Sequence, residues 1–304
     1  FLKKAKIFIA GHKGMVGSAV LEFLKKKNFK NLVIADRTAL DLTDSIKVKK
    51  FIKKRKPDVV INCAGRVGGI MANYKYPTEF LFENIKIQMN LMNSCFDNNI
   101  KNVILLGSSC IYPKFAKQPI KEDYLMSGKL EKTNDAYAVA KIATEKHLKY
   151  LYDAYGFPAI IFRNANSYGR KYNHQFVIES IIYQMLKGKS PVKLGDPTPY
   201  RDFVFEPDLL SAYVLAAESN NKKILGESIN IGTGKSLSIK QLAEKIRKIT
   251  GYKGKIQWNS FPKRSLEIPK LEVDNTKAKK LLKWKPKYTL DEGLEITASY
   301  YKKD

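Results

Sequence analysis

The chain has 304 residues, of which 44% are hydrophobic and 28% are charged. This composition fits one large or two modest folded cores and excludes a disordered chain. Lysine and arginine exceed aspartate and glutamate by 26 charges, but the lysines are spread along the whole chain, which predicts a solvated basic surface and no nucleic-acid partner. No apolar run approaches the roughly 18 residues of a membrane span, so we expect no membrane contact and a cytoplasmic protein.

The first half of the chain alternates short apolar strands with helices. Strands are expected at 6–10, 31–35, 58–62, 102–107 and 159–163, and helices at 19–27, 44–53, 79–98 and 134–154. Such alternation with short connections places parallel strands side by side and covers both faces of the sheet with helices. The predicted fold class is therefore α/β, with a Rossmann-type, doubly wound parallel sheet.

Beyond residue 165 the rhythm is less regular. Helices are expected near 174–187, 207–219, 238–250 and 274–282, with loops at 188–200 and 261–269. We therefore predict two domains. Residues 1–165 form the first domain, which contains the large sheet, and residues 166–304 form mainly a smaller α/β C-terminal lobe that returns some segments to the first domain.

A glycine-rich loop joins the first strand to the first helix. Its glycines are Gly11, Gly14 and Gly17. The first allows a tight turn, the second lets the backbone approach a pyrophosphate at the helix N-terminus, and the third lets helix and strand pack closely. The loop predicts a bound dinucleotide, and Met15 and Val16, which follow Gly14, are expected to belong to the same site.

Three residues bear on which dinucleotide binds. Asp36 closes the second strand, where a carboxylate suits the ribose 2′-hydroxyl of NAD. Lys13 and Arg37 instead suit the 2′-phosphate of NADP, because both are cations. These residues alone leave both cofactors open.

The residues that suggest catalysis lie on the fourth strand and the helix after it. Tyr137 and Lys141 stand four residues apart, so they share one face of the expected helix. An ammonium beside a phenol is expected to lower the pKa of the phenol, which can then exchange a proton with a carbonyl oxygen near neutral pH. Ser108 follows the fourth strand, at the sheet edge where ligands of doubly wound folds bind.

The cysteines and histidines do not suggest a metal site. Cys63, Cys95 and Cys110 are too few for a disulfide framework, and no cysteine or histidine pair has the spacing of metal ligands. We therefore expect no bound metal and a reducing compartment. Taken alone, Cys110 is typical of a small buried apolar side chain at a strand end.

The glycine loop and the order Ser108, Tyr137, Lys141 resemble the extended short-chain dehydrogenase/reductase family. Four segments closely resemble the GDP-L-fucose synthase family within it: GHKGMVGSA at 11–19, VGGIMANYKYP at 67–77, GSSCIYPKFAKQP at 107–119 and GKLEKTNDAYAVAKIA at 128–143. The resemblance implies an enzyme that epimerises C3 and C5 of a GDP-4-keto-6-deoxyhexose and then reduces its C4 ketone. It favours NADP(H) as the cofactor, with NAD(H) as the alternative, and implies a GDP-sugar substrate and a homodimer.

The same resemblance implies a role for each catalytic residue. Ser108 and Tyr137 would hold and protonate the C4 oxygen, while Lys141 would hold the nicotinamide ribose and tune Tyr137. Cys110 would be one acid/base of the epimerisation, since a thiol can move a proton at a carbon next to a ketone. Asn166 would contact the substrate.

Residues later in the chain match the positions that contact the substrate in the family. Arg201 matches a family arginine that contacts the diphosphate or nucleotide, which suits a guanidinium. The family's second acid/base is a histidine directly before a Val-Ile helix start, where this sequence has Phe176. His174, two residues earlier, is our candidate. If the chain is instead similar to GDP-mannose 3,5-epimerase, Lys171 would take this place.

The leading hypothesis is therefore a combined epimerase and reductase of the GDP-L-fucose synthase type. Two alternatives stay open, namely a nucleotide-sugar epimerase that retains its NAD, as GDP-mannose 3,5-epimerase does, and a C4 reductase without epimerase activity. A non-catalytic dinucleotide sensor or nucleic-acid-binding protein is disfavoured, because neither needs an intact Ser-Tyr-Lys set.

Overall fold

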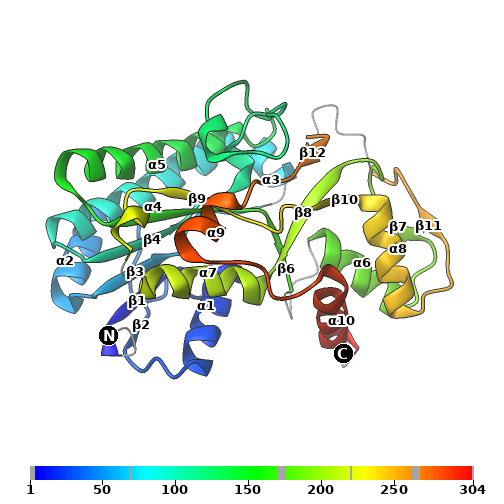
Figure 1. Ribbon diagram of the computed structural model, residues 1–304, viewed down its shortest axis with the longest axis horizontal. Helices are drawn as coiled ribbons and strands as arrows, with labels where there is room; N and C mark the ends of the chain where they lie inside the picture. Colours follow the sequence, from blue (N-terminus) through cyan, green and yellow to red (C-terminus); the bar gives the residue numbers. More distant parts are fainter. Residues whose placement is uncertain (1–3, 69, 170–175, 220, 262–267, 303–304) are drawn as a thin grey trace.

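The computed structural model describes residues 4–68, 70–169, 176–219, 221–261 and 268–302, and it confirms the α/β class (Figure 1). Its large sheet has six parallel strands in the order β2–β1–β3–β4–β5–β9. They are β1 (Ile7–Ala10), β2 (Leu32–Val33), β3 (Val59–Asn62), β4 (Asn102–Leu106), β5 (Ala159–Asn164) and β9 (Ser228–Ile231). The first five were expected, and the sixth comes from the second half of the chain.

Helices cover both faces of this sheet, as expected. One face packs against α2 (Ser45–Arg55), α4 (Pro77–Asp97) and α5 (Asp135–Tyr155), and the other against α1 (Met15–Lys26), α7 (Glu206–Glu218) and α9 (Thr276–Leu282). Because both faces are covered, the apolar side chains of the strands are almost all buried. Figure 1 shows α4 and α5 running side by side along one face.

The first helix begins earlier than expected. The apolar pattern predicted a start at residue 19, but α1 starts at Met15, because Gly14 takes an extended conformation and ends the loop as the N-cap. The second helix begins where its cap predicted. Asp44 accepts a hydrogen bond from the amide of Lys47 at 3.0 Å and so satisfies an N–H group of the first turn.

The second half of the chain builds a smaller mixed sheet. Its path is β10–β8–β12, and β6 also pairs with β8. The strands are β6 (Asn166–Tyr168), β8 (Tyr200–Phe205), β10 (Ser236–Ser238) and β12 (Lys270–Leu271), while β7 (Val192–Lys193) and β11 (Ile256–Gln257) form a separate pair. With α6 (Val177–Leu186), α8 (Ile239–Thr250) and α10 (Leu290–Tyr301), these strands enclose a hydrophobic core of their own.

Three elements of the second half lie on the large sheet. β9 forms its edge beside β5, α7 packs against α1, and α9 packs against β9. The domain boundary near residue 165 stays a prediction. The expected loop at 188–200 contains β7, which is two residues long and carries no alternating pattern that would reveal it.

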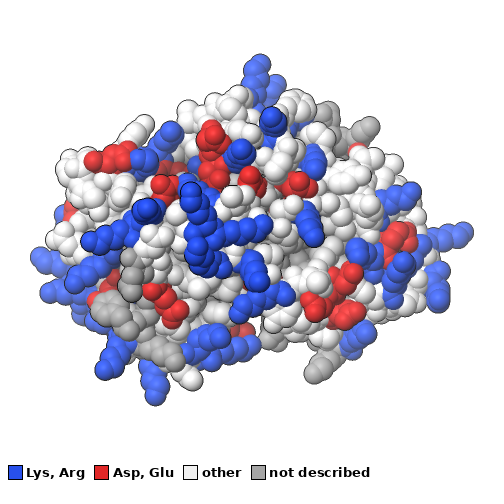
Figure 2. Space-filling view, viewed as in Figure 1, with Lys and Arg blue, Asp and Glu red and all other residues white. Residues whose placement is uncertain are grey.

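The basic side chains do not gather in one place on the visible face. Figure 2 shows Lys and Arg over nearly all of it, with Asp and Glu between them. Some form exposed ion pairs, such as Lys245 with Asp291 at 2.8 Å. Within the part of the chain that the structure describes, no helix has the length and apolar character needed to cross a membrane.

A capping box fixes the start of α8. The hydroxyl of Ser238 accepts from the amide of Gln241 at 3.1 Å, and the side chain of Gln241 accepts from the amide of Ser238 at 2.9 Å. We expect Ser238→Ala to lower the free energy of unfolding by about 1 kcal/mol, because the Gln241 amide loses its partner. Urea denaturation measures this. Ser299→Ala, at an exposed serine within α10, should change it by less than about 0.5 kcal/mol, and equal losses in the two variants would contradict the prediction.

Candidate active site

The glycine loop packs tightly against the first turn of α1. Gly11 has a φ of +76°, which other residues rarely adopt, and a Cβ there would lie 2.8 Å from the backbone of Ala64. The amide of Gly14 donates to the carbonyl oxygen of Gly11 at 2.9 Å. A Cβ on Gly17 would overlap this same oxygen. The glycines therefore meet the steric needs from which the loop was predicted.

This loop lies where the strand order of the sheet reverses. The chain passes from β1 to β2 on one side, and β3 then pairs with the other side of β1. Gly11 approaches Ala64, which follows β3. Ligands of doubly wound sheets bind at such a crossing, and a helix N-terminus there suits a pyrophosphate. Met15 and Val16 lie half-buried in the first turn of that helix, so their position suits the predicted dinucleotide site.

Lys13 and Asp36, which favoured different cofactors, contact each other. The Nζ atom of Lys13 lies 3.0 Å from Oδ2 of Asp36, and Oδ1 accepts from Thr38 Oγ1 at 2.7 Å. The hydrogen bond from Thr38, a backbone amide and the nearby ammonium hold the pKa of Asp36 well below its usual range. Arg37 follows, with its Nε 3.9 Å from the carboxylate of Asp41. The end of β2 thus offers a carboxylate and two cations together.

The Tyr-Lys helix and the strand-end serine meet at the carboxyl edge of the large sheet. Lys141 Nζ donates to the carbonyl oxygen of Leu106, the last residue of β4, at 2.9 Å, and lies 5.7 Å from the centre of the Tyr137 ring. Ser108 Oγ accepts from the amide of Cys110 at 3.1 Å and opens the 3₁₀ turn η2 (Ser109–Ile111). Because α5 packs against η2, the structure brings the four predicted catalytic residues of this region to one strand end.

Burial governs the proton affinities at this strand end. It raises the pKa of Tyr137, and the neighbouring Cys110 acts in the same direction. The predicted lowering of this pKa by Lys141 is therefore wrong for this structure, since desolvation of the phenolate dominates. Lys141 is only 5% exposed, and burial lowers its pKa to about 8, while Glu145 and then Cys63 oppose that shift.

The lowered pKa of Lys141 predicts a rise in stability with pH. Below its folded pKa of about 8, Lys141 is protonated in both states, and the protein bears the desolvation of a buried charge. Between about 8 and the unfolded value of 10.5, only the unfolded state keeps the proton, so the free energy of unfolding increases. We expect the free energy of unfolding of the parent protein, relative to that of a Lys141→Met variant, to increase by about 2 kcal/mol from pH 7 to about 9.5 in urea denaturation. The comparison cancels the opposite contribution of Cys63 and Cys95, whose burial raises the pKa of their thiols. A difference that does not change with pH would exclude Lys141 as the source.

The predicted substrate residues lie on neighbouring strands beyond β5. Asn166 begins β6 and pairs in register with Phe203 of β8, two residues after Arg201. Nδ2 of Asn166 is buried and has no hydrogen-bond partner among the described residues. Arg201 Nη1 donates to the carbonyl oxygens of Tyr200 and Ile268 at 2.8 Å each, which fixes its guanidinium between β8 and the segment before β12.

The candidates for the second acid/base cannot be placed. His174 and Lys171 both lie outside the residues that the structure describes. Phe176, at the position where the family has its histidine, is described and forms the N-cap of α6 without a side-chain cap. The predicted role of His174 therefore stays a prediction.

Sequence reasoning missed a buried ion pair behind the catalytic residues. Arg163 places Nη2 at 2.8 Å and Nε at 2.9 Å from Oε2 of Glu145, and the two side chains are 4% and 2% exposed. Nη1 of Arg163 also donates to the hydroxyl of Tyr112 at 2.9 Å and to the carbonyl oxygen of Glu122 at 2.7 Å. A signal was present, because Arg163 follows four apolar residues of its strand and Glu145 follows Lys141 by one helical turn.

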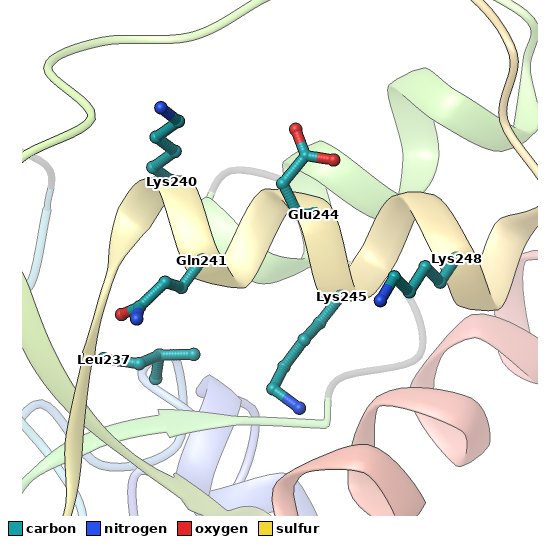
Figure 3. A pocket seen from close by; sticks show the side chains of 6 residues that line it. All are labelled: Leu237, Lys240, Gln241, Glu244, Lys245 and Lys248. Carbon is teal, nitrogen blue, oxygen red and sulfur yellow. The ribbon is translucent and has the colours of Figure 1, made fainter.

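A separate hollow of about 420 Å³ lies along the outer side of α8 (Figure 3). Six side chains line it: Leu237, Lys240, Gln241, Glu244, Lys245 and Lys248. They are mostly long and charged, and none belongs to the predicted site. In the described ranges, no group of three His, Cys, Asp or Glu side chains is placed to hold a metal ion.

The fold and the site geometry define a dinucleotide-dependent enzyme of the short-chain dehydrogenase/reductase class. The chain belongs to the NAD dependent epimerase/dehydratase family, whose sequence pattern matches residues 7–232. It is an NAD(P)-dependent epimerase or reductase of nucleotide sugars, as the relatives described next are.

The similarity to known proteins extends over the whole chain. GDP-L-fucose synthase 1 of Arabidopsis thaliana is 37% identical over 311 aligned positions, which cover 99% of this chain and 94% of that protein. Two solved structures from Campylobacter jejuni are each 30% identical. One is a GDP-D-glycero-L-gluco-heptose synthase in the presence of NADPH, with a TM-score of 0.89 and coverage of 100% and 99%. The other is a GDP-mannoheptose C4 reductase with NADP bound, with a TM-score of 0.87 and coverage of 99% of both chains.

Proposed function

We propose that this protein is an epimerase and reductase of the GDP-L-fucose synthase type, which epimerises C3 and C5 of a GDP-4-keto-6-deoxyhexose and reduces its C4 ketone with NADPH. The observation that carries the proposal is the placement of Ser108, Tyr137 and Lys141 at one strand end, with Cys110 in the following turn. The similarity to the plant GDP-L-fucose synthase over nearly the full chain supports the choice of substrate.

In the reduction, a cofactor held by the glycine loop and by Lys141 would supply the hydride for the C4 carbon. Tyr137 donates its phenolic proton to the C4 oxygen as the carbon–oxygen double bond opens, so the ketone becomes an alcohol and Tyr137 a phenolate. Ser108 donates a hydrogen bond to the same oxygen. Because burial raises the pKa of Tyr137, the phenol keeps its proton until the transfer. The Lys141 ammonium, 5.7 Å from the ring centre, stabilises the phenolate that remains.

In the epimerisation, Cys110 moves a proton at a carbon next to the C4 ketone. The ketone makes the C3 and C5 protons acidic, because the negative charge left at carbon spreads onto the C4 oxygen. Inversion returns a proton to the opposite face of the sugar, which needs a second acid/base. His174 is our proposal for this group, and Lys171 is its alternative.

The substrate is proposed to extend from this strand end across β6 and β8. The buried Nδ2 group of Asn166 can donate a hydrogen bond to the substrate there, and Arg201 carries a positive charge on the next strand. A guanidinium matches a diphosphate by charge and by paired hydrogen bonds. In this proposal residues 166–304 mainly bind the nucleotide sugar, and residues 1–165 bind the dinucleotide.

NADPH is the proposed cofactor. Lys13, whose side chain is 71% exposed, and Arg37 are positioned at the end of β2 to contact a 2′-phosphate, and both Campylobacter structures hold NADP or NADPH. NAD(H) is the second candidate, because the Asp36 carboxylate suits a 2′-hydroxyl. The ratio of kcat/KM for NADPH and NADH decides between them, and a preference for NADH would reject the first choice.

A homodimer through α4 and α5 is also proposed. These helices lie side by side on the outer surface and expose large apolar side chains, among them Phe82, Val139 and Tyr155. Burying such side chains against a second subunit removes apolar surface from water, which favours association. Sedimentation equilibrium tests the proposal, and a monomer at micromolar concentration would reject it.

One assay separates the proposed activity from its alternatives. Purified protein is mixed with GDP-4-keto-6-deoxymannose and NADPH, oxidation of the cofactor is followed by absorbance, and the product is identified by NMR. GDP-L-fucose supports the full proposal. A reduced but uninverted sugar would leave a C4 reductase, an outcome made plausible by the GDP-mannoheptose C4 reductase among the structural neighbours. Epimerised 4-keto sugar without cofactor oxidation would leave an epimerase that lacks the reduction step. Inversion of GDP-mannose with no added cofactor would identify an epimerase that retains NAD.

A further inference from the structure

A buried carboxylate lies next to Lys141, and the reaction described above does not use it. Glu145 follows Lys141 by one turn of α5, so the two side chains share a helix face. Glu145 is 3% exposed. Its Oε2 accepts from Arg163 Nε at 2.9 Å and from Ser228 Oγ at 3.3 Å, and it pairs with Arg163 Nη2 at 2.8 Å. One of its two oxygens is therefore fully engaged.

The other oxygen faces the catalytic strand end. Oε1 of Glu145 is buried and has no hydrogen-bond partner in the described structure. A Cβ built on Gly107 would lie 2.9 Å from it, so a glycine at this position leaves the room that Oε1 occupies. Glu145 thus places a negative charge beside Gly107. Gly107 lies between Leu106, whose carbonyl oxygen accepts from Lys141, and Ser108, which is proposed to hold the substrate oxygen.

We infer that Glu145 is a positioning residue, whose buried carboxylate keeps the Lys141 side chain protonated at the end of β4. The inference rests on the proposed role of Lys141 in the reduction. Arg163 holds the carboxylate in one orientation through a hydrogen bond from Nε and an ion pair with Nη2. In a buried setting, a nearby opposite charge acts strongly because little water screens it.

The other ionisable groups around Lys141 do not supply this charge. Cys63, which follows β3, has the smaller effect on Lys141, and burial raises the pKa of its thiol to about 12, so it is neutral near pH 7. Tyr137, on the same helix, is likewise neutral because burial raises its pKa. Arg163, on β5 beyond Glu145, is a cation and cannot supply it either. Glu145 is the anion among these groups, and it opposes the lowering of the Lys141 pKa more than Cys63 does.

Glu145→Gln tests the inference, because it removes the charge and keeps the shape. In the parent protein the free energy of unfolding is expected to start rising near the Lys141 pKa of about 8. In the variant we expect this onset to move down by about one pH unit, since Lys141 loses its counter-charge. The decline of kcat/KM at high pH should move by the same amount. A residue that only stabilises the fold would move neither.

The unfolding measurement needs no substrate, so the two hypotheses can fail separately. If the onset moves and no keto-sugar is turned over, the proposed function fails and the role of Glu145 stands. Ser228→Ala is the matched control, because it removes the longest hydrogen bond to the same carboxylate and keeps the charge. Its onset should stay near that of the parent.

If the Glu145→Gln variant does not fold, a double variant tests the same inference. The double variant Glu145→Gln/Arg163→Met removes both charges of the ion pair, and its onset should still move down because the charge that opposes the lowering of the Lys141 pKa is gone. An onset that stays near pH 8 in whichever variant folds would overturn the inference and leave Glu145 as a partner of Arg163 alone.

Discussion

Replacing Tyr137 by phenylalanine is expected to lower kcat/KM for reduction of the GDP-4-keto sugar by about 10²- to 10⁴-fold, the range for loss of a general acid. The variant lacks the proton that the C4 oxygen takes up as hydride arrives. The ring itself remains, and with it the contact to the Lys141 ammonium at 5.7 Å. Ser108 also remains to hydrogen-bond the oxygen, so some activity should persist.

Three measurements show whether the loss is chemical. NADPH binding, followed by fluorescence, should be unchanged, because only a hydroxyl is removed. Deuterium from solvent should still enter the sugar at C3 or C5, since this exchange depends on Cys110. Tyr150→Phe, which removes the same group from an exposed tyrosine of α5, should keep the parent rate. A Tyr137→Phe variant that reduces the sugar at the parent rate would reject Tyr137 as the acid.

The first half of the fold follows from its sequence because its strands are buried on both faces. Such strands are continuous apolar runs, and 58–62 and 102–107 were located to within a residue of β3 and β4. In the second half of the chain, β7 and β12 are two residues long, which is too short for any periodicity. Their pairing depends on contacts between distant segments, as in β12 with β8, and no local pattern carries that information.

The candidate site shows the same division. Residues set by local geometry were predictable, since spacing alone places Tyr137 and Lys141 on one helix face and Gly17 against Gly11. The proton affinity of Tyr137 was not, because it depends on how completely the surrounding chain excludes water. The ion pair of Glu145 with Arg163 joins residues of α5 and β5, and it became visible only with the fold.

Replacing Arg163 by methionine should be the most destabilising of the substitutions considered. The change leaves the Glu145 carboxylate buried without its cation, and the hydroxyl of Tyr112 and the carbonyl oxygen of Glu122 lose a donor. Breaking a buried ion pair from one side costs about 3–5 kcal/mol of unfolding free energy. Lys245→Met is the control, because its ion pair with Asp291 is exposed and such a pair contributes at most about 1 kcal/mol.

Removing the carboxylate as well should recover much of that loss. In Glu145→Gln/Arg163→Met neither member of the ion pair is left buried without the other, and replacing both members of a buried pair is often close to neutral. Urea denaturation of the two single variants and the double variant gives the coupling energy. If the double variant is as unstable as the sum of the single ones, the pair is not coupled. If stability recovers while the Lys141 onset stays shifted, the cycle separates the two roles of Glu145, because Arg163 is then needed for the fold and the carboxylate for the lysine.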